Sequence, residues 1–161
     1  MNLTHFHLLL NHLPILGSFF GILIFLSGYV FKELPVRKAG LGIFIFAAIM
    51  AIPAYFTGKP AENAIKNLPD IAKGMIERHE TVAVVALGCI LALGLLSAVV
   101  FYLITCKKGK TKILMTSILI LSLVTFGLMA WTARTGGQIR HSEIRPADFP
   151  ASLMISTEEN E

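Results

Sequence analysis

Charged residues are scarce in this chain. Aspartate, glutamate, lysine and arginine make up 15% of its 161 residues, whereas 55% of the residues are hydrophobic. Soluble domains carry about 25% charged residues, and their helices keep a polar face toward water. Here the hydrophobic residues gather in long blocks and do not alternate with polar ones at a helical or strand period. The composition therefore argues against a soluble domain.

Cysteines and catalytic motifs are scarce as well. The two cysteines, Cys89 and Cys106, lie within and at the end of one apolar block, too far apart to form a disulfide. No Cys-x-x-Cys-His sequence is present, which argues against a covalently attached haem. Nucleotide-binding, zinc-protease and serine-hydrolase motifs are also absent. We therefore expect a redox carrier or a subunit of a larger assembly, not a stand-alone enzyme.

Four blocks with almost no charge make up most of the chain, at 8–31, 39–57, 82–105 and 113–132. A helix needs roughly 20 apolar residues to cross about 30 Å of hydrocarbon. Backbone in lipid must satisfy its own hydrogen bonds, which favours helices. The blocks predict an all-α fold, an integral membrane four-helix up-down bundle over residues 1–141. Residues 142–161 are expected to form a polar C-terminal tail.

The charges that flank the blocks predict an orientation. Lys32, Arg37 and Lys38 lie in the first short connection, and the connection over 106–112 contains four lysines. Short loops rich in lysine and arginine stay in the cytoplasm. Both termini and the connection over 58–81 are then outside, in a protein of the bacterial inner (cytoplasmic) membrane. This topology accounts for the basic pI of about 9.2, and no nucleic-acid partner is expected.

All five histidines fall on the predicted outer side; they are His5, His7, His12, His79 and His141. His12 is about one turn into the first block and His79 opens the third, so their imidazoles are expected at similar depth. The first and third helices of an up-down bundle lie diagonally across its core. His12 and His79 are therefore candidate axial ligands of a b-type haem near the outer face. The alternative is a pair of interfacial histidines that bond to neighbouring helices.

Two arginines after the fourth block extend this hypothesis. Arg134 and Arg140 carry planar forks that suit carboxylates, and they are predicted to bind the haem propionates. They could equally pair with lipid phosphate or with an acidic side chain such as Glu62 or Glu80. Both readings remain open from the sequence.

Two further functions are compatible with the same residues. An outer-facing copper or zinc site could use His5, His7, His12 and Glu80 as its ligands. A non-redox membrane scaffold subunit would need no cofactor at all. An optical spectrum with and without reductant distinguishes the three.

The run from His7 to Ile15, HLLLNHLPI, resembles the opening of a family of uncharacterised bacterial four-helix membrane proteins. Its members begin with His-Pro and continue a few residues later with His-Phe-Pro-Ile. Thr57-Gly58 at the end of the second block, His79 before the third and Gly136-Gly137 after the fourth extend the resemblance. The chain departs from the family in that no proline follows His5 or His7 and Leu13 replaces the phenylalanine.

Some relatives in that family are joined to Rieske iron–sulfur or cytochrome c modules, so the resemblance implies a respiratory electron-transfer setting. Together with the histidines, it predicts a membrane-embedded electron-transfer protein that binds haem b. Its expected partners are the lipid bilayer and a membrane or periplasmic redox protein.

Overall fold

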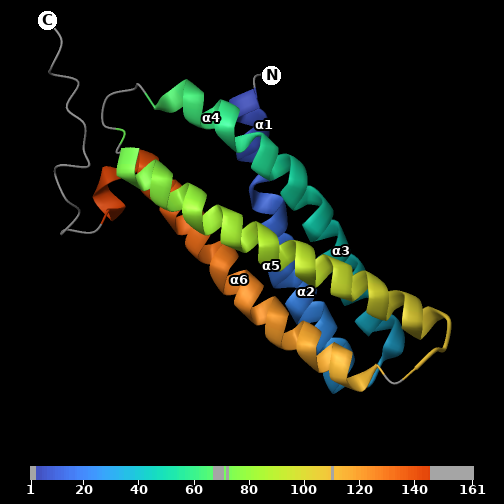
Figure 1. Cartoon of the computed structure of the whole chain (residues 1–161). Coiled ribbons are helices and arrows are strands. Elements are labelled where there is room, and N and C mark those ends of the chain that lie inside the picture. Colours follow the sequence, from blue (N-terminus) through green and yellow to red (C-terminus); the bar gives the residue numbers. More distant parts are fainter. Residues whose placement is uncertain (1–2, 67–70, 72, 110, 146–161) are drawn as a thin grey trace, which may run out of the picture.

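The computed structural model describes residues 3–66, 71, 73–109 and 111–145 (Figure 1). Every regular element in these residues is a helix. In chain order they are α1 (Leu3–Leu10), α2 (His12–Val30), α3 (Leu34–Phe56), α4 (Gly58–Ile65), α5 (Lys73–Thr105), α6 (Lys112–Arg140) and the 3₁₀ turn η1 (Ser142–Ile144). The all-α prediction is confirmed. Most of the predicted polar tail, from residue 146 onward, lies outside the described residues.

Four helical stretches in the described part are long and apolar enough to cross a membrane, at Thr4–Val30, Leu34–Ile65, Lys73–Thr105 and Lys112–Arg140. They coincide with the four predicted blocks but extend beyond them. The extensions of α5 and α6 are helical because their ends pack on each other and on Ile71, burying Ile71, Met75, Ile76 and Ile139. These helix ends contain polar as well as apolar residues, so the search for apolar blocks did not include them.

A proline divides the first stretch into α1 and α2. Pro14 has no N–H to donate to the carbonyl of Leu10, so the helical ladder loses a bond just before it. Two helices are therefore distinguished on either side of Asn11, although Asn11 itself keeps helical backbone angles, with φ −63° and ψ −21°. The short helix α1 contacts α3 and α4 as well as α2, and this places His7 beside the end of α3.

The long helices form an up-down bundle (Figure 1). α2 packs against α3 and α6, and α5 packs against the same two helices, so α2 and α5 are diagonal partners. The start of α1 and the end of α6 lie at one end of the bundle, and the two short turns lie at the other (Figure 1). In those turns Lys32 has a φ of 60° and Lys107 a φ of 52°, the left-handed conformation in which helices commonly end.

The bundle is apolar outside and partly polar inside. Phe56, Leu95 and Ile113 are 72%, 70% and 81% exposed, whereas Ser97 and Thr125 are fully buried. Water would penalise such a surface, but hydrocarbon does not. The apolar surface is therefore compatible with a membrane, as are the lengths of the four apolar helices.

Small residues set the spacing between helices. A Cβ added at Gly40 would lie 2.7 Å from the backbone of Phe25, and one added at Gly94 would lie 2.3 Å from Cβ of Ala48. Gly40 of α3 therefore lies directly against α2, and Gly94 of α5 lies directly against α3, with almost no side chain between the backbones. Close approach through small residues is how helices associate in lipid, where the hydrophobic effect gives no drive between them.

Candidate functional site

His7 of α1 bonds to the last turn of α3. Its Nδ1 lies 3.0 Å from the carbonyl oxygen of Ala54 and 3.2 Å from Oγ1 of Thr57. A backbone carbonyl oxygen only accepts hydrogen bonds, so Nδ1 must carry the proton. In the neutral imidazole, Nε2 then keeps its lone pair. The contact with α3 therefore determines both the tautomer and the orientation of the ring.

His79 of α5 makes the same contacts with α6. Its Nδ1 lies 3.0 Å from the carbonyl oxygen of Thr132 and 3.3 Å from Oγ1 of Thr135. The proton is again on Nδ1 and the lone pair on Nε2. Like His7, the ring is only partly exposed. The two histidines thus come from different helices but have the same protonated nitrogen and the same kind of partner.

The two threonines are held in matching ways. Thr57 Oγ1 donates to the carbonyls of Pro53 and Ala54, at 2.8 and 3.0 Å. Thr135 Oγ1 donates to the carbonyls of Trp131 and Thr132, at 3.2 and 3.0 Å. Because the proton of each hydroxyl is directed at its own helix, an oxygen lone pair faces the imidazole.

A glycine follows each threonine and lies against the ring. A Cβ at Gly58 would be 3.6 Å from Cε1 of His7, and one at Gly136 would be 3.1 Å from Cε1 of His79. A side chain at Gly136 would crowd its imidazole, so the small residue allows the ring to approach α6.

The pairing of His7 with His79 belongs to an internal repeat. Every buried residue of α2 has a buried counterpart in α5 at one constant offset, and His7 has His79 at that same offset. The buried pairs are Pro14 with Ala86, Ser18 with Ile90, Gly21 with Leu93, Ile22 with Gly94, Phe25 with Ser97 and Gly28 with Val100. The two helices therefore present equivalent faces to the bundle.

The partner helices repeat in part. A second constant offset relates buried positions of α3 and α4 to buried positions of α6, and it also relates the histidine-binding residues. These pairs are Gly40 with Ile118, Phe44 with Ser122, Ala47 with Thr125, Ala54 with Thr132, Thr57 with Thr135, Gly58 with Gly136 and Ala61 with Ile139. The molecule is thus two similar helical hairpins, and each contributes one histidine to the end of the bundle that we call the histidine end.

The two imidazoles lie at the histidine end, each bonded within its own hairpin. Each has an unprotonated Nε2, which can accept a hydrogen bond or bind a metal ion. A hydrogen bond from the other ring nitrogen to a carbonyl oxygen is the usual way in which proteins orient a metal-binding histidine.

The predicted ligand His12 has a different environment. Its side chain is exposed on the surface of α2, and its Nδ1 lies 3.0 Å from the carbonyl oxygen of Leu8 in the preceding turn. His79, in contrast, bonds across helices to α6. The structure thus groups His79 with His7, five residues before His12 in the chain.

The alternative metal site is not assembled. In residues 3–66, 71, 73–109 and 111–145, no three His, Cys, Asp or Glu side chains lie close enough to hold one ion. Glu80, one of its predicted ligands, is 3.2 Å from Nζ of Lys59, which also pairs with Glu62 at 2.5 Å. The pair with Glu80 connects α4 to α5, and the pair with Glu62 lies within α4. His141 lies apart from the histidine pair and pairs with Glu143 at 2.8 Å.

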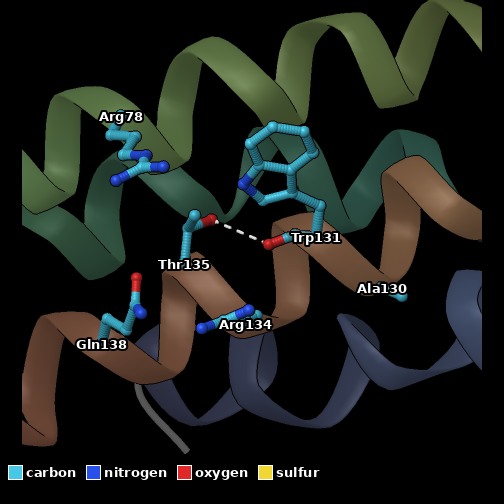
Figure 2. A pocket seen from close by; sticks show the side chains of 6 residues that line it. All are labelled: Arg78, Ala130, Trp131, Arg134, Thr135 and Gln138. Carbon is cyan, nitrogen blue, oxygen red and sulfur yellow. Dashed lines mark hydrogen bonds between the residues drawn. The ribbon is translucent and has the colours of Figure 1, made fainter. Parts of the chain in front are cut away.

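The two predicted arginines occupy different surfaces. Arg134 lines a cleft of about 490 Å³ together with Arg78, Ala130, Trp131, Thr135 and Gln138 (Figure 2). Arg140 is exposed at the end of α6 and is not among the lining residues. Thr135 lines this cleft and also bonds to His79, so the cleft is one hydroxyl group away from the imidazole. That Arg134 and Arg140 bind propionates stays a prediction.

A sequence signal could have identified His7. The segment from Ala54 to Gly58 and the segment from Thr132 to Gly136 share the spacing of a small or hydroxyl residue, two others, then Thr-Gly. Each follows a histidine by a similar interval. The shared motif is short and the residues around it differ between the two segments, so a hydropathy profile does not detect it.

Comparison of the chain with models of known protein families, with characterised proteins and with solved structures found no match. The resemblance to the His-Phe-Pro-Ile family therefore stays a prediction.

Proposed function

We propose that this protein is a membrane-embedded electron-transfer protein that binds b-type haem through Nε2 of His7 and Nε2 of His79. The observation that carries the proposal is the matched pair of Nδ1 bonds, to Ala54 and Thr57 on one side and to Thr132 and Thr135 on the other. In both imidazoles the Nδ1 bond to a carbonyl oxygen leaves the lone pair of Nε2 available to a metal. His7 takes the place that the sequence suggested for His12.

The donor set suits this cofactor. Haem iron takes four nitrogens from the porphyrin and two axial ligands from the protein, and neutral imidazole is a common axial ligand. When bound, the haem would supply one-electron chemistry. The chain would supply the two ligands, each on its own hairpin, and the carbonyl acceptors that raise the basicity of the imidazoles. Ligation would then also tie the two hairpins together at the histidine end.

A second candidate is a copper(I) ion held by the same two nitrogens. Imidazole suits copper as well as iron, and His7 and His79 would hold the ion. The observation that favours it is the donor count, because no third His, Cys, Asp or Glu joins the pair in the described residues. Neither imidazole lines the cleft between α5 and α6, and a single ion needs less room than a porphyrin.

The optical spectrum of the purified protein, with metal analysis, tests the proposal. We expect one iron per chain and a Soret band that sharpens and shifts when dithionite is added. Copper without a Soret band would support the second candidate against the first. A protein that contains neither metal, and takes up neither haem nor copper(I) on addition, would be a scaffold in which the histidines serve only to lock helices together.

The proposed orientation places the histidine end outside and the two short turns in the cytoplasm, because those turns carry the lysines. Cys106 allows a direct test, since it is exposed at the end of α5, while Cys89 is partly buried within the helix. In intact cells, a membrane-impermeant maleimide is expected to leave Cys106 unlabelled until the membrane is permeabilised.

The control is Glu143→Cys in a chain whose native cysteines are alanine. Residue 143 is exposed beyond the end of α6, so this cysteine is expected to react in intact cells. Labelling of Cys106 but not of residue 143 in intact cells would show that the orientation is inverted.

A further inference from the structure

The cleft between α5 and α6 carries two arginines that have no partner among the residues that the structure describes. Arg78 comes from α5 and Arg134 from α6, and both are exposed. Among the described residues, neither guanidinium makes a hydrogen bond or an ion pair. The side chain of Lys59, in contrast, is neutralised by its ion pairs with Glu62 and Glu80. The cleft therefore concentrates uncompensated positive charge.

The other lining residues add donors and an aromatic wall. Figure 2 shows the indole nitrogen of Trp131 on the side of its ring that faces Arg78. Gln138 is only 3% exposed, and its Nε2 donates to the carbonyl of Ile144, which holds the amide in place at the end of the cleft. Thr135 is fully engaged in bonds within α6 and to His79. Guanidinium and indole groups both donate, so the cleft suits an acceptor with several oxygens.

The internal repeat shows that the fold does not need these residues. At the equivalent positions the first hairpin carries apolar side chains. The equivalents are Phe6 for Arg78, Pro53 for Trp131, Phe56 for Arg134 and Pro60 for Gln138. Phe6 and Phe56 are 42% and 72% exposed, as lipid-facing residues are. Since one hairpin forms with phenylalanine at both places, packing of the hairpin does not require arginine there.

The position of the cleft identifies the kind of anion. Trp131 stands where the long apolar part of α6 gives way to Arg134 and Arg140. Tryptophan at such a boundary marks the depth of lipid headgroups. The planar fork of arginine binds phosphate with two parallel hydrogen bonds. A phosphodiester next to glycerol would offer its oxygens to both arginines while its acyl chains lie along the apolar surface of α5 and α6.

We propose that the cleft formed by Arg78, Trp131, Arg134 and Gln138 binds a phosphate-bearing anion, the headgroup of an anionic phospholipid. The inference does not depend on any metal at His7 and His79. It does place the lipid next to that pair, because Thr135 contacts His79 and also lines the cleft.

Trp131 is the single tryptophan of the chain, so its fluorescence reports directly on the cleft. The full chain in detergent micelles is titrated with phosphatidylglycerol that is brominated near the ester end of its acyl chains. Phosphatidylcholine with the same chains serves for comparison. We expect half-maximal quenching at about a tenfold lower mole fraction of phosphatidylglycerol, because the choline cation of phosphatidylcholine repels the two arginines and offsets the charge of its phosphate.

The variants decide whether the cleft is responsible. Arg78→Gln with Arg134→Gln is expected to abolish the preference for phosphatidylglycerol, whereas the matched control Arg140→Gln, at the same end of the molecule but outside the cleft, is expected to keep it. Far-UV circular dichroism confirms that the variants are folded, which their exposed positions favour. An equal preference in the double variant and in the parent, or no preference in the parent, would overturn the proposal.

A separate arm distinguishes a lipid headgroup from free phosphate. Inorganic phosphate is added to the phosphatidylglycerol complex, with sodium chloride at matched ionic strength as its control. Equal relief of quenching by the two salts supports the lipid, since only screening is then involved. Much stronger relief by phosphate would mean that a small phosphate ion is the ligand, and the lipid assignment would be wrong.

Discussion

Replacing His7 or His79 with alanine is expected to remove the metal centre completely. Each variant loses one of the two nitrogens that we propose as ligands, and the affinity should fall by more than about 100-fold, beyond the usual effect of losing a residue that only supports a ligand. The Soret band and the bound iron should both disappear after purification. Because the two positions are equivalent in the repeat, the two variants should be equally affected.

The matched control is His12→Ala. His12 lies one turn away from His7 along the same stretch but is exposed, and its only described bond is to Leu8 in its own turn. Its spectrum is expected to equal that of the parent. A normal spectrum in His7→Ala together with a lost spectrum in His12→Ala would reverse our assignment in favour of His12.

The threonines provide an intermediate case. Thr57→Val and Thr135→Val each remove one acceptor of the Nδ1 proton but leave the backbone carbonyl in place. A supporting group of this kind typically contributes about 10-fold or more to metal affinity. Weakened cofactor retention with an unchanged spectrum would therefore indicate a role in orientation. Equal retention in both variants and the parent would show that the carbonyls alone suffice.

Replacing Gly40 with alanine is expected to cause the largest loss of stability among the glycine substitutions in α3. The added methyl group would lie 2.7 Å from N, Cα and Cβ of Phe25, and backbone atoms cannot rotate out of the way. α2 and α3 must then separate, which loosens the contact between the Phe25 and Phe44 rings, now 6.0 Å apart. Overpacking of this kind costs about 1–3 kcal/mol.

Gly42→Ala is the control, on the same helix two residues later. A Cβ at Gly42 meets nothing within 4 Å, so the substitution should be neutral or stabilise the helix by about 0.5–1 kcal/mol. The two variants are compared by thermal unfolding in the same detergent. If Gly40→Ala is as stable as Gly42→Ala, then α2 and α3 do not pack as closely in solution as the structure shows.

Hydropathy was sufficient to predict the helices because crossing hydrocarbon requires a local property, a run of about 20 apolar residues. It was insufficient at the ends. α5 begins at Lys73 and α6 continues to Arg140 because Met75 and Ile139 are buried against each other's helices. The two helix ends stabilise one another, so neither sequence segment by itself predicts that its end is helical.

The sequence by itself determined that the chain forms four long apolar helices and that its histidines avoid the segments rich in lysine. It placed His79 at the start of the third helix, whereas α5 begins six residues earlier, at Lys73. Only the tertiary structure decided which histidine is the counterpart of His79. Pro14 breaks the first stretch and α1 packs on α3 and α4, so His7 reaches Ala54 while His12 faces outward. The choice depends on the contacts of α1 with α3 and α4, which join segments far apart in the sequence and do not follow from the spacing of residues along one helix.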